Sequence, residues 1–424
     1  MQDNLREGKN PIKISKNWII RGHMKLNKEI LKKKELTLPF FYTNGTCENA
    51  FYTKLIEFHD CVKEYEDVDF VWLDNLAQFE KYIKKMFEEY YLGHQGKAYS
   101  AFRDALRCAL NETPVIKTAI PDEPLYRARV NTGVEDYKNN EMFHIKYDER
   151  SKVSTQRFSF PGLPCLYLGG SSYVCWLELN RPQFDQFQVA SFKQVNAEDE
   201  RLILDLSIHP VTFYNELLRK EDGKETEHEY LTLEEYLKLW PIIAACSIAV
   251  KNEKNPFKPE YIFPQFMLQA ILEKEKPIFE DVCGIRYMSI KAGKICMRQY
   301  ESDYRTYTNY VFPIQSKDSN SEGHCKFLSS LFQIERNYSG KELQIISDMI
   351  REGNIKWVRT DEMITKEMLS TLDEAEFYGS NGKAYPYGKS IFRRIEKILA
   401  GVGDVGANVF ITDVRNSDID KMYS

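Results

Sequence analysis

Apolar side chains recur at helical spacing in the first quarter of the chain. After Asp74 most of them stand three or four residues apart, at Leu76, Phe79, Ile83, Met86, Phe87 and Tyr90. This spacing predicts an amphipathic helix, with Asp74 as its N-cap and Gly93 as its end. A second helix is predicted from Ala98 to Ala109, and Pro114 ends the pattern. Residues 1–113 are therefore expected to form a mostly helical N-terminal region.

The pattern changes after residues 111–124 (NETPVIKTAIPDEP), which contain three prolines and are expected to connect two domains. Short β-like runs follow at 125–130, 165–169 and 202–206, mixed with helices. A helical insert is expected at about 210–255. The polar stretch Ser316–Gly323 closes this middle domain, residues 124–315. The mixture of short strands and helices predicts an α+β fold.

Residues 325–424 alternate again and are expected to form a small C-terminal α/β extension. Helices are predicted near 341–351, 366–377 and 390–400, and strands near 356–358 and 408–412. The run Gly401–Gly406 (GVGDVG) fits the G-x-G-x-x-G pattern of dinucleotide sites, which requires a strand before the glycines and a helix after them. Here a helix precedes and a strand follows, so a helix end and a turn are the better interpretation.

Charge and cysteine usage narrow the class of protein. The formal net charge of −5 gives no global attraction to nucleic acid, so a nucleic-acid partner is not expected. The basic cluster Lys25–Lys34 is interpreted as a solvated helix face, with a contact to nucleic acid or to an acidic partner as the alternative. The nine cysteines include no CxxC pair, and the adjacent His324–Cys325 has no further ligands nearby, so no metal site is expected.

The chain shows no sign of a membrane or a secretory address. Its start lacks the apolar core of a secretory signal, and the most apolar later run, Trp240–Val250, is about half as long as a membrane span. These features predict a cytoplasmic protein.

The candidate chemistry lies in residues 125–182, which contain LYRAR and RFSFPGLPCLYLGGSSYVCWLELNRP. Arg157, Tyr167 and Glu178 stand at intervals of ten and eleven, with a glycine-containing loop after the arginine. Spacing alone does not establish chemistry, because a surface ion pair or a buried tyrosine hydroxyl explains each residue equally well.

The ordered motifs of residues 124–315 resemble the RES domain of bacterial NAD-degrading toxins, a family named for its Arg, Glu and Ser residues. The match places the family's first arginine at Arg127, its second at Arg157, its tyrosine at Tyr167 and its glutamate at Glu178. PEYIFPQFMLQAI resembles a helix-opening stretch with a Pro-Gln pair, GIRYMS ends at the family serine, Ser289, and NYVFP resembles the closing strand. The chain departs from the family pattern at Gln156, where glycine is expected, and at Met288, where proline is frequent.

The resemblance implies an ADP-ribosyltransferase-like split sheet with flanking helices and NAD as the substrate. Arg127 and Arg157 would then bind the pyrophosphate, and Glu178 would stabilise the oxocarbenium-like centre that forms when nicotinamide leaves. Tyr167 would stack on nicotinamide or hydrogen-bond the ribose, and Ser289 would hold the ribose or a phosphate. The implied enzyme is an NAD glycohydrolase or phosphorylase, used as a toxin or defence effector.

Two alternatives stay open beside this reading. One is ADP-ribosyl transfer to a macromolecule, and the other is a non-catalytic module that binds a nucleotide and regulates a partner. An active NAD consumer must be restrained in its own host. We expect this restraint to come from an antitoxin or another inhibitory partner, or from the regions that flank residues 124–315.

Overall fold

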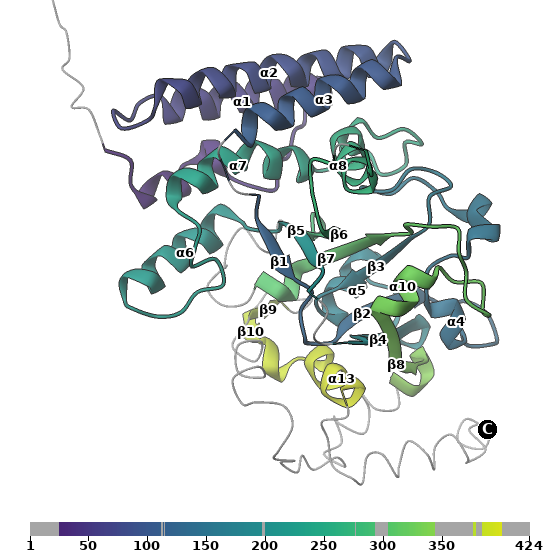
Figure 1. The fold of residues 1–424 in the computed structure, drawn as a ribbon. Helices are drawn as coiled ribbons and strands as arrows, with labels where there is room; N and C mark the ends of the chain where they lie inside the picture. Colours follow the sequence, from purple (N-terminus) through teal and green to yellow (C-terminus); the bar gives the residue numbers. More distant parts are fainter. Residues whose placement is uncertain are drawn as a thin grey trace, which may run out of the picture.

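The structure is a computed structural model, shown in Figure 1, in which three layers of helix and sheet lie one above the other. It describes residues 25–111, 113, 115–196, 200–275, 277–292, 304–343, 376–378 and 384–400.

The N-terminal region forms three helices, which we call the N-terminal helices: α1 (Cys47–Val62), α2 (Phe70–Tyr91) and α3 (Gln95–Ala109). Two short 3-10 turns precede them, η1 (Lys28–Lys32) and η2 (Lys34–Leu36). The two predicted helices are confirmed, but the prediction of Asp74 as an N-cap is wrong. Helix α2 begins one turn earlier, where the Asp69 side chain accepts a hydrogen bond of 3.0 Å from the amide of Val71. Gly93 does end the helix, with a φ of 80° that favours glycine.

The centre of the molecule is an eight-stranded sheet with the order β1-β5-β6-β7-β3-β2-β4-β8. All neighbouring strands run antiparallel except β5 and β6, which run parallel. The α+β class is therefore confirmed. The strands are β1 (Lys117–Ala119), β2 (Leu125–Val130), β3 (Cys165–Gly169), β4 (Phe187–Gln194), β5 (Leu202–Leu206), β6 (Val282–Met288), β7 (Thr308–Pro313) and β8 (Phe332–Tyr338).

The sheet almost divides in two between β2 and β3. These neighbours pair through one residue pair, Tyr126 with Gly169, whereas β2 pairs with β4 through six and β3 with β7 through five. Beyond Tyr126, the edge of β2 that faces β3 has no partner strand among the described residues. We call this opening the sheet split.

Helices cover the sheet and bind the N-terminal helices to it. Two of them, α6 (Pro210–Glu221) and α7 (Leu233–Cys246), lie within the helical insert expected at 210–255, and α8 (Ile262–Leu272) follows. Figure 1 shows α7 and α8 between the sheet and the N-terminal helices. One continuous apolar core joins these layers, with Phe58 stacked on Trp240 at 4.2 Å and Phe102 against Phe263 at 5.0 Å between ring centroids. Removing the N-terminal helices would therefore expose the apolar faces of α7 and α8.

The connector and the C-terminal part both contribute strands to the main sheet. The predicted connector 111–124 contains β1, which pairs with β5, because its apolar Ile116 and Ile120 are buried on either side of this strand. Strand β8 pairs with β4 and follows the short helix α10 (Lys326–Leu331). The remaining short elements are α4 (Asn139–Met142), η3 (Tyr147–Lys152), η4 (Phe184–Gln186), η5 (Pro259–Tyr261), η6 (Tyr304–Tyr307) and η7 (Tyr387–Lys389).

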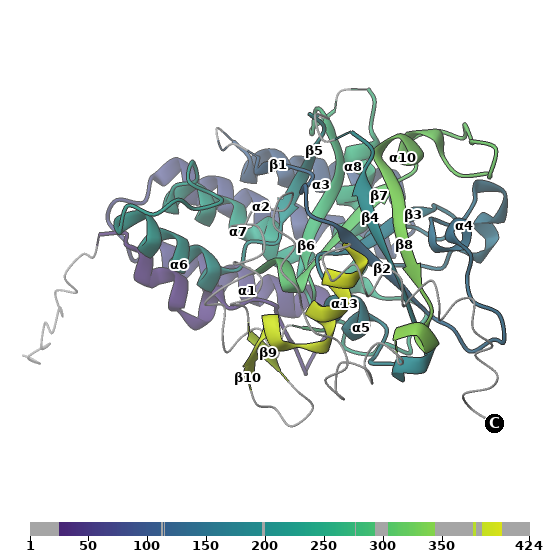
Figure 2. The ribbon, with the colours of Figure 1, turned by 90° about the horizontal axis from the view of Figure 1, so that it is seen from below.

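The predicted helix 390–400 is confirmed as α13 (Ile391–Leu399), which contacts α5 (Ser172–Glu178), as Figure 2 shows. The buried carboxylate of Glu396 on α13 accepts hydrogen bonds from the Ser172 amide at 2.7 Å and from the Tyr387 hydroxyl at 2.7 Å. A two-stranded sheet of β9 (Glu376–Tyr378) and β10 (Ala384–Pro386) precedes α13. Strand β9 shows that the helix predicted at 366–377 is wrong at its end, where pairing with β10 overrides helical spacing.

The other C-terminal predictions lie wholly or mostly outside the described residues. They are the rest of the helices at 341–351 and 366–377, the strands at 356–358 and 408–412, and Gly401–Gly406.

Candidate active site

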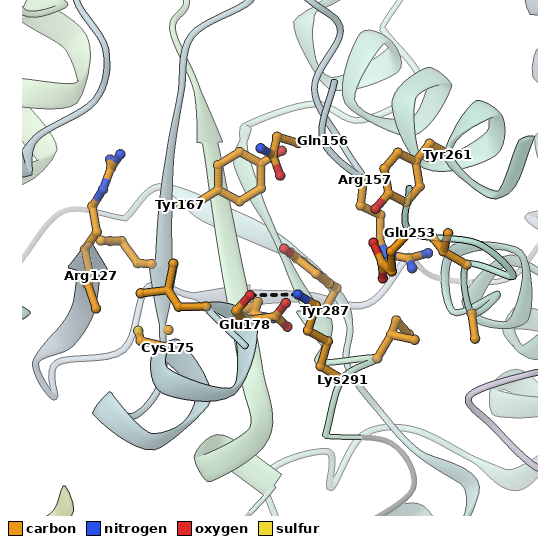
Figure 3. Close-up of a pocket in the computed structure, with 18 of the residues that line it drawn as sticks. Arg127, Gln156, Arg157, Tyr167, Cys175, Glu178, Glu253, Tyr261, Tyr287 and Lys291 are labelled. Carbon is orange, nitrogen blue, oxygen red and sulfur yellow. Dashed lines mark hydrogen bonds between the residues drawn. The ribbon is translucent and has the colours of Figure 1, made fainter. Parts of the chain in front are cut away.

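A cavity of about 620 Å³ opens at the sheet split. Its walls come from β2, β3, the C-terminal end of α5, and the segment between α7 and α8. Four of the five predicted site residues line it: Arg127, Arg157, Tyr167 and Glu178 (Figure 3). The fifth, Ser289, is fully buried and lies behind Glu178 instead. The structure thus gathers residues that are up to 162 positions apart in the sequence.

The Glu178 carboxylate is held in one orientation by two neutral donors. Its Oε1 accepts hydrogen bonds of 2.7 Å from Ser289 Oγ and of 2.7 Å from Asn309 Nδ2. Ser289 Oγ in turn accepts from the amide of Ala292 at 3.2 Å, so its hydroxyl proton points to the carboxylate. Asn309 lies on β7 and Ser289 directly follows β6, so two strands of the central sheet position the donors that hold the carboxylate.

Lys291 holds the end of the helix that carries Glu178. Its ammonium donates to the backbone carbonyl of Glu178 at 2.8 Å and to the side-chain carbonyl of Asn180 at 2.9 Å. The backbone turns sharply here, since Asn180 and Arg181 adopt φ values of 62° and 58°. A cation at a helix C-terminus is favourable, and Lys291 also lines the cavity.

Two tyrosines form the middle of the cavity wall. Tyr167 donates its hydroxyl proton to Ser159 Oγ at 3.0 Å. Tyr287, on β6, packs against Phe158 with 4.6 Å between ring centroids. Burial raises the pKa of both tyrosines well above its usual value, and the charge of Glu178 adds to the effect at Tyr287. Both side chains are therefore neutral and offer flat rings with a hydroxyl group.

Arg157 is partly engaged by the protein itself. Its Nη1 donates to the carbonyl of Cys246, the last residue of α7, at 3.3 Å and to that of Ile248, just past the helix, at 2.9 Å. Its guanidinium lies 5.1 Å from the centroid of the Tyr261 ring. In Figure 3, Arg157 and Arg127 lie on opposite sides of Tyr167 and Glu178. This arrangement does not bring the two arginines together on one group.

The Pro264–Gln265 pair supports the loop that carries Arg157. The Gln265 amide nitrogen, on α8, donates to Thr155 Oγ1 at 2.9 Å and lies 3.1 and 3.2 Å from the carbonyls of Gln156 and Ser159. This side chain is 6% exposed, so the loop is fastened in the interior. Gln265 thereby sets the position of Arg157 and of the Ser159 hydroxyl that receives the Tyr167 proton.

Arg127 differs from Arg157 in having a guanidinium nitrogen with nothing to bind. Its Nη1 is closed off from solvent and makes no hydrogen bond within the described part of the chain. Burial, with a smaller effect of the neighbouring Arg129, lowers the pKa of Arg127 to about 9. A buried donor without a partner is costly, and together with its place in the cavity wall this makes Arg127 a candidate for binding a ligand.

The N-terminal region completes the cavity. Residues 38–42, which we call the strap, run alongside the segment after α7, with Phe40 N donating to Ser247 O at 3.2 Å and Ala249 N donating to Phe40 O at 2.8 Å. The strap places Phe41 in the cavity wall. The Tyr42 hydroxyl fastens its end by donating to the buried carboxylate of Glu260 at 2.6 Å.

Metal chemistry and membrane insertion find no support in the described residues. No group of three or more His, Cys, Asp or Glu side chains in these ranges is arranged to hold a metal ion. No described helix combines the length and the apolar character needed to cross a bilayer.

A protein of Bacillus subtilis is similar over most of the chain. The "Putative toxin YopC" of Bacillus subtilis (strain 168) is 34% identical over 309 residues, which are 70% of this chain and 67% of YopC. The chain belongs to the YopC family. No protein-family model and no solved structure matches it.

For this member of the YopC family, the sequence motifs identified most of the cavity but missed several of its residues. Asn309 and Tyr287 lie inside motifs noted above, NYVFP and GIRYMS, where strand alternation alone did not show which side chains face the cavity. Tyr261 stands at the start of the stretch with the Pro-Gln pair, and Lys291 stands two residues after Ser289. Phe41 had no signal at all, because its place depends on a pairing across more than 200 residues.

Proposed function

We propose that the protein is a toxin or defence effector that consumes NAD by breaking the bond between nicotinamide and ribose. The observation that carries the proposal is the arrangement around the Glu178 carboxylate. Two neutral donors, Ser289 and Asn309, hold one of its oxygens, and the neutral rings of Tyr167 and Tyr287 line the same cavity. A fixed carboxylate in a partly closed cavity suits a reaction that develops positive charge on a sugar carbon.

The bond between ribose C1′ and the nicotinamide nitrogen breaks with its electron pair moving to the nitrogen. Nicotinamide leaves as a neutral amide, and the ribose becomes oxocarbenium-like. Oε1 of Glu178 is occupied by Ser289 and Asn309, and no described residue donates to Oε2, which is left to face the ribose. Since the positive charge exists mainly in the transition state, Glu178 lowers the barrier more than it improves binding.

The rest of the cavity binds and orients the substrate. Tyr167 and Tyr287 provide flat surfaces for the nicotinamide ring, and Arg127 provides an unpaired donor for a phosphate oxygen. Ser289 is enclosed behind Glu178, so in this proposal it positions the carboxylate rather than contacting the ribose.

The acceptor that attacks C1′ completes the reaction. With water, the oxygen bonds to C1′, a proton is released and the products are ADP-ribose and nicotinamide. With inorganic phosphate, an oxygen of the phosphate bonds to C1′ instead. The similarity to a protein named as a toxin supports a role in arresting growth, and a toxin of this kind needs an antitoxin or another inhibitory partner.

The test is to incubate the purified full-length protein with NAD, with and without inorganic phosphate, and to follow nicotinamide and ADP-ribose by chromatography. We expect nicotinamide release in either condition or only with phosphate, which separates hydrolysis from phosphorolysis. Label from NAD on a macromolecule would identify ADP-ribosyl transfer instead. The absence of nicotinamide release in every condition would refute the proposal.

A further inference from the structure

Strand β2 carries a second arginine with an unpaired buried donor. Arg129 stands two residues after Arg127, so the two side chains leave the same face of the strand at positions about 7 Å apart. Nη1 of Arg127 and Nε of Arg129 are both closed off from solvent and make no hydrogen bond within the described ranges. Buried polar groups are usually paired, so two unpaired donors on one strand face make this part of β2 a candidate for ligand binding.

No described carboxylate forms an ion pair with either guanidinium. On the neighbouring strand β4 they face Ala190 and Gln188, which are neutral. The guanidinium of Arg129 lies 5.3 Å from the centroid of the Tyr137 ring. Burial lowers the pKa of Arg129, an effect that the nearby Tyr137 and Glu141 oppose, and the charge of Arg129 adds to the lowering of the pKa of Arg127. Both side chains are partly buried, and their two positive charges lie on one strand face without an ion pair to a described carboxylate.

The location of this pair points to a ligand rather than to a packing role. Both residues lie beyond Tyr126, where β2 has no partner on the side of the sheet split, and Arg127 lines the cavity. Arg157 stands across the cavity with Nη1 already bound to two carbonyls. The unpaired donors of β2 therefore lie on the side of the cavity opposite to Arg157.

We propose that Arg127 and Arg129 together form a diphosphate-binding site along β2, with Arg129 as the second arginine in place of Arg157. Two forked guanidiniums on one strand face match the spread of phosphate oxygens in a diphosphate, and both can bind them in bidentate fashion. That the diphosphate belongs to NAD rests on the proposed function. The anion site itself rests on the two arginines alone.

The test compares the full-length protein with Arg129→Met, Arg127→Met and a matched control, Arg150→Met. Arg150 is exposed on η3, and its guanidinium also lies over a tyrosine ring, 4.7 Å from the centroid of Tyr147. Calorimetry measures the binding of inorganic pyrophosphate and of ADP-ribose at low and at moderate salt. We expect both β2 variants to lose about tenfold or more in affinity for both probes, with a weaker dependence on salt, and the control to change less than about twofold.

The unfolding temperature without ligand separates a binding role from a structural one. Removing an arginine that has no ion pair should leave the unfolding temperature of the ligand-free protein unchanged or raise it. Pyrophosphate should raise the unfolding temperature of the parent more than that of Arg129→Met. Normal pyrophosphate affinity in Arg129→Met overturns the proposal, and so does a parent that binds neither probe. The proposal is also overturned if Arg129→Met has a lower unfolding temperature than the parent and pyrophosphate still stabilises both proteins equally. If the parent releases no nicotinamide but loses pyrophosphate binding on Arg129→Met, the proposed function fails while the anion site stands.

Discussion

The substitution Glu178→Gln tests the proposed chemistry most directly, because it removes the charge and keeps the shape. The glutamine carbonyl can still accept from Ser289 and Asn309, which now bind Oε1, and the amide nitrogen takes the place of Oε2. A unit charge about 4 Å from a developing positive charge contributes about 4 kcal/mol at the effective dielectric constant of a partly buried site. This corresponds to a loss of roughly 10³ in turnover.

The assay is nicotinamide release under saturating NAD, combined with calorimetric measurement of NAD affinity and circular dichroism to check folding. Affinity should change only a few-fold, because the positive charge on the ribose is small before the bond breaks. Glu253→Gln is the matched control, since Glu253 lines the same cavity, is exposed at its rim and has no role in the proposed reaction. Turnover of Glu178→Gln near the parent rate would show that the assignment of Glu178 is wrong, and most of the mechanism with it.

Three further predictions follow from particular contacts. Asn309→Leu removes one charge-assisted hydrogen bond to Glu178 and should lower turnover roughly tenfold to a hundredfold, with little change in NAD affinity. Steady-state kinetics and calorimetry measure the two quantities. A large loss of affinity would contradict a positioning role for Asn309. Burial lowers the pKa of His144 to about 4, and its neutral ring donates to Ile145 O and accepts from Cys325 N. As the pH falls from about 6.5 to 4, this histidine takes up a proton in the unfolded chain but not in the folded protein, so the folded state loses stability. The free energy of unfolding should then drop by about 3 kcal/mol more for the parent than for His144→Gln over this range in urea titrations, and parallel pH profiles would refute the assignment. Residues 120–320 expressed alone should be insoluble and should not arrest growth, because the fragment lacks β1 and β8 of the main sheet and exposes the faces of α7 and α8 that the N-terminal helices cover. A soluble, toxic fragment would show that the removed regions restrain the protein instead.

The sequence predicted best what depends on neighbours in the chain. Strands β2, β3 and β5 have the predicted bounds, because alternation, branched residues and flanking turns act within a few residues. The start of α2 was placed one turn late, since Phe70 and Val71 at its first turn are exposed and do not contribute to the apolar face that marked the helix. Strand β9 was predicted as the end of a helix because its partner β10 follows only after the chain has turned back.

The site was predicted as a set of residues but not as an arrangement. Motif order placed Arg127, Arg157, Tyr167 and Glu178 together, yet it could not show that Nη1 of Arg157 is taken by carbonyls at the end of α7 or that Ser289 is enclosed behind Glu178. Arg129 stands in the same LYRAR motif as Arg127, and the sequence could not show that its Nε is closed off from solvent without a partner. Such properties depend on which strands meet, and the sheet order is a long-range feature.

The strap changes how the restraint expected for the proposed toxin should be understood. If the N-terminal helices were a detachable inhibitor, they would be expected to cover the cavity and to share little core with the rest. Instead the strap contributes Phe41 to the cavity wall, pairs with the segment after α7 that also binds Arg157, and continues into helices that share one apolar core with α7 and α8. A displacement of the strap would therefore disturb the cavity rather than uncover it. This favours a separate inhibitory partner as the source of restraint. By binding the strap or the segment after α7, such a partner would alter the cavity without entering it.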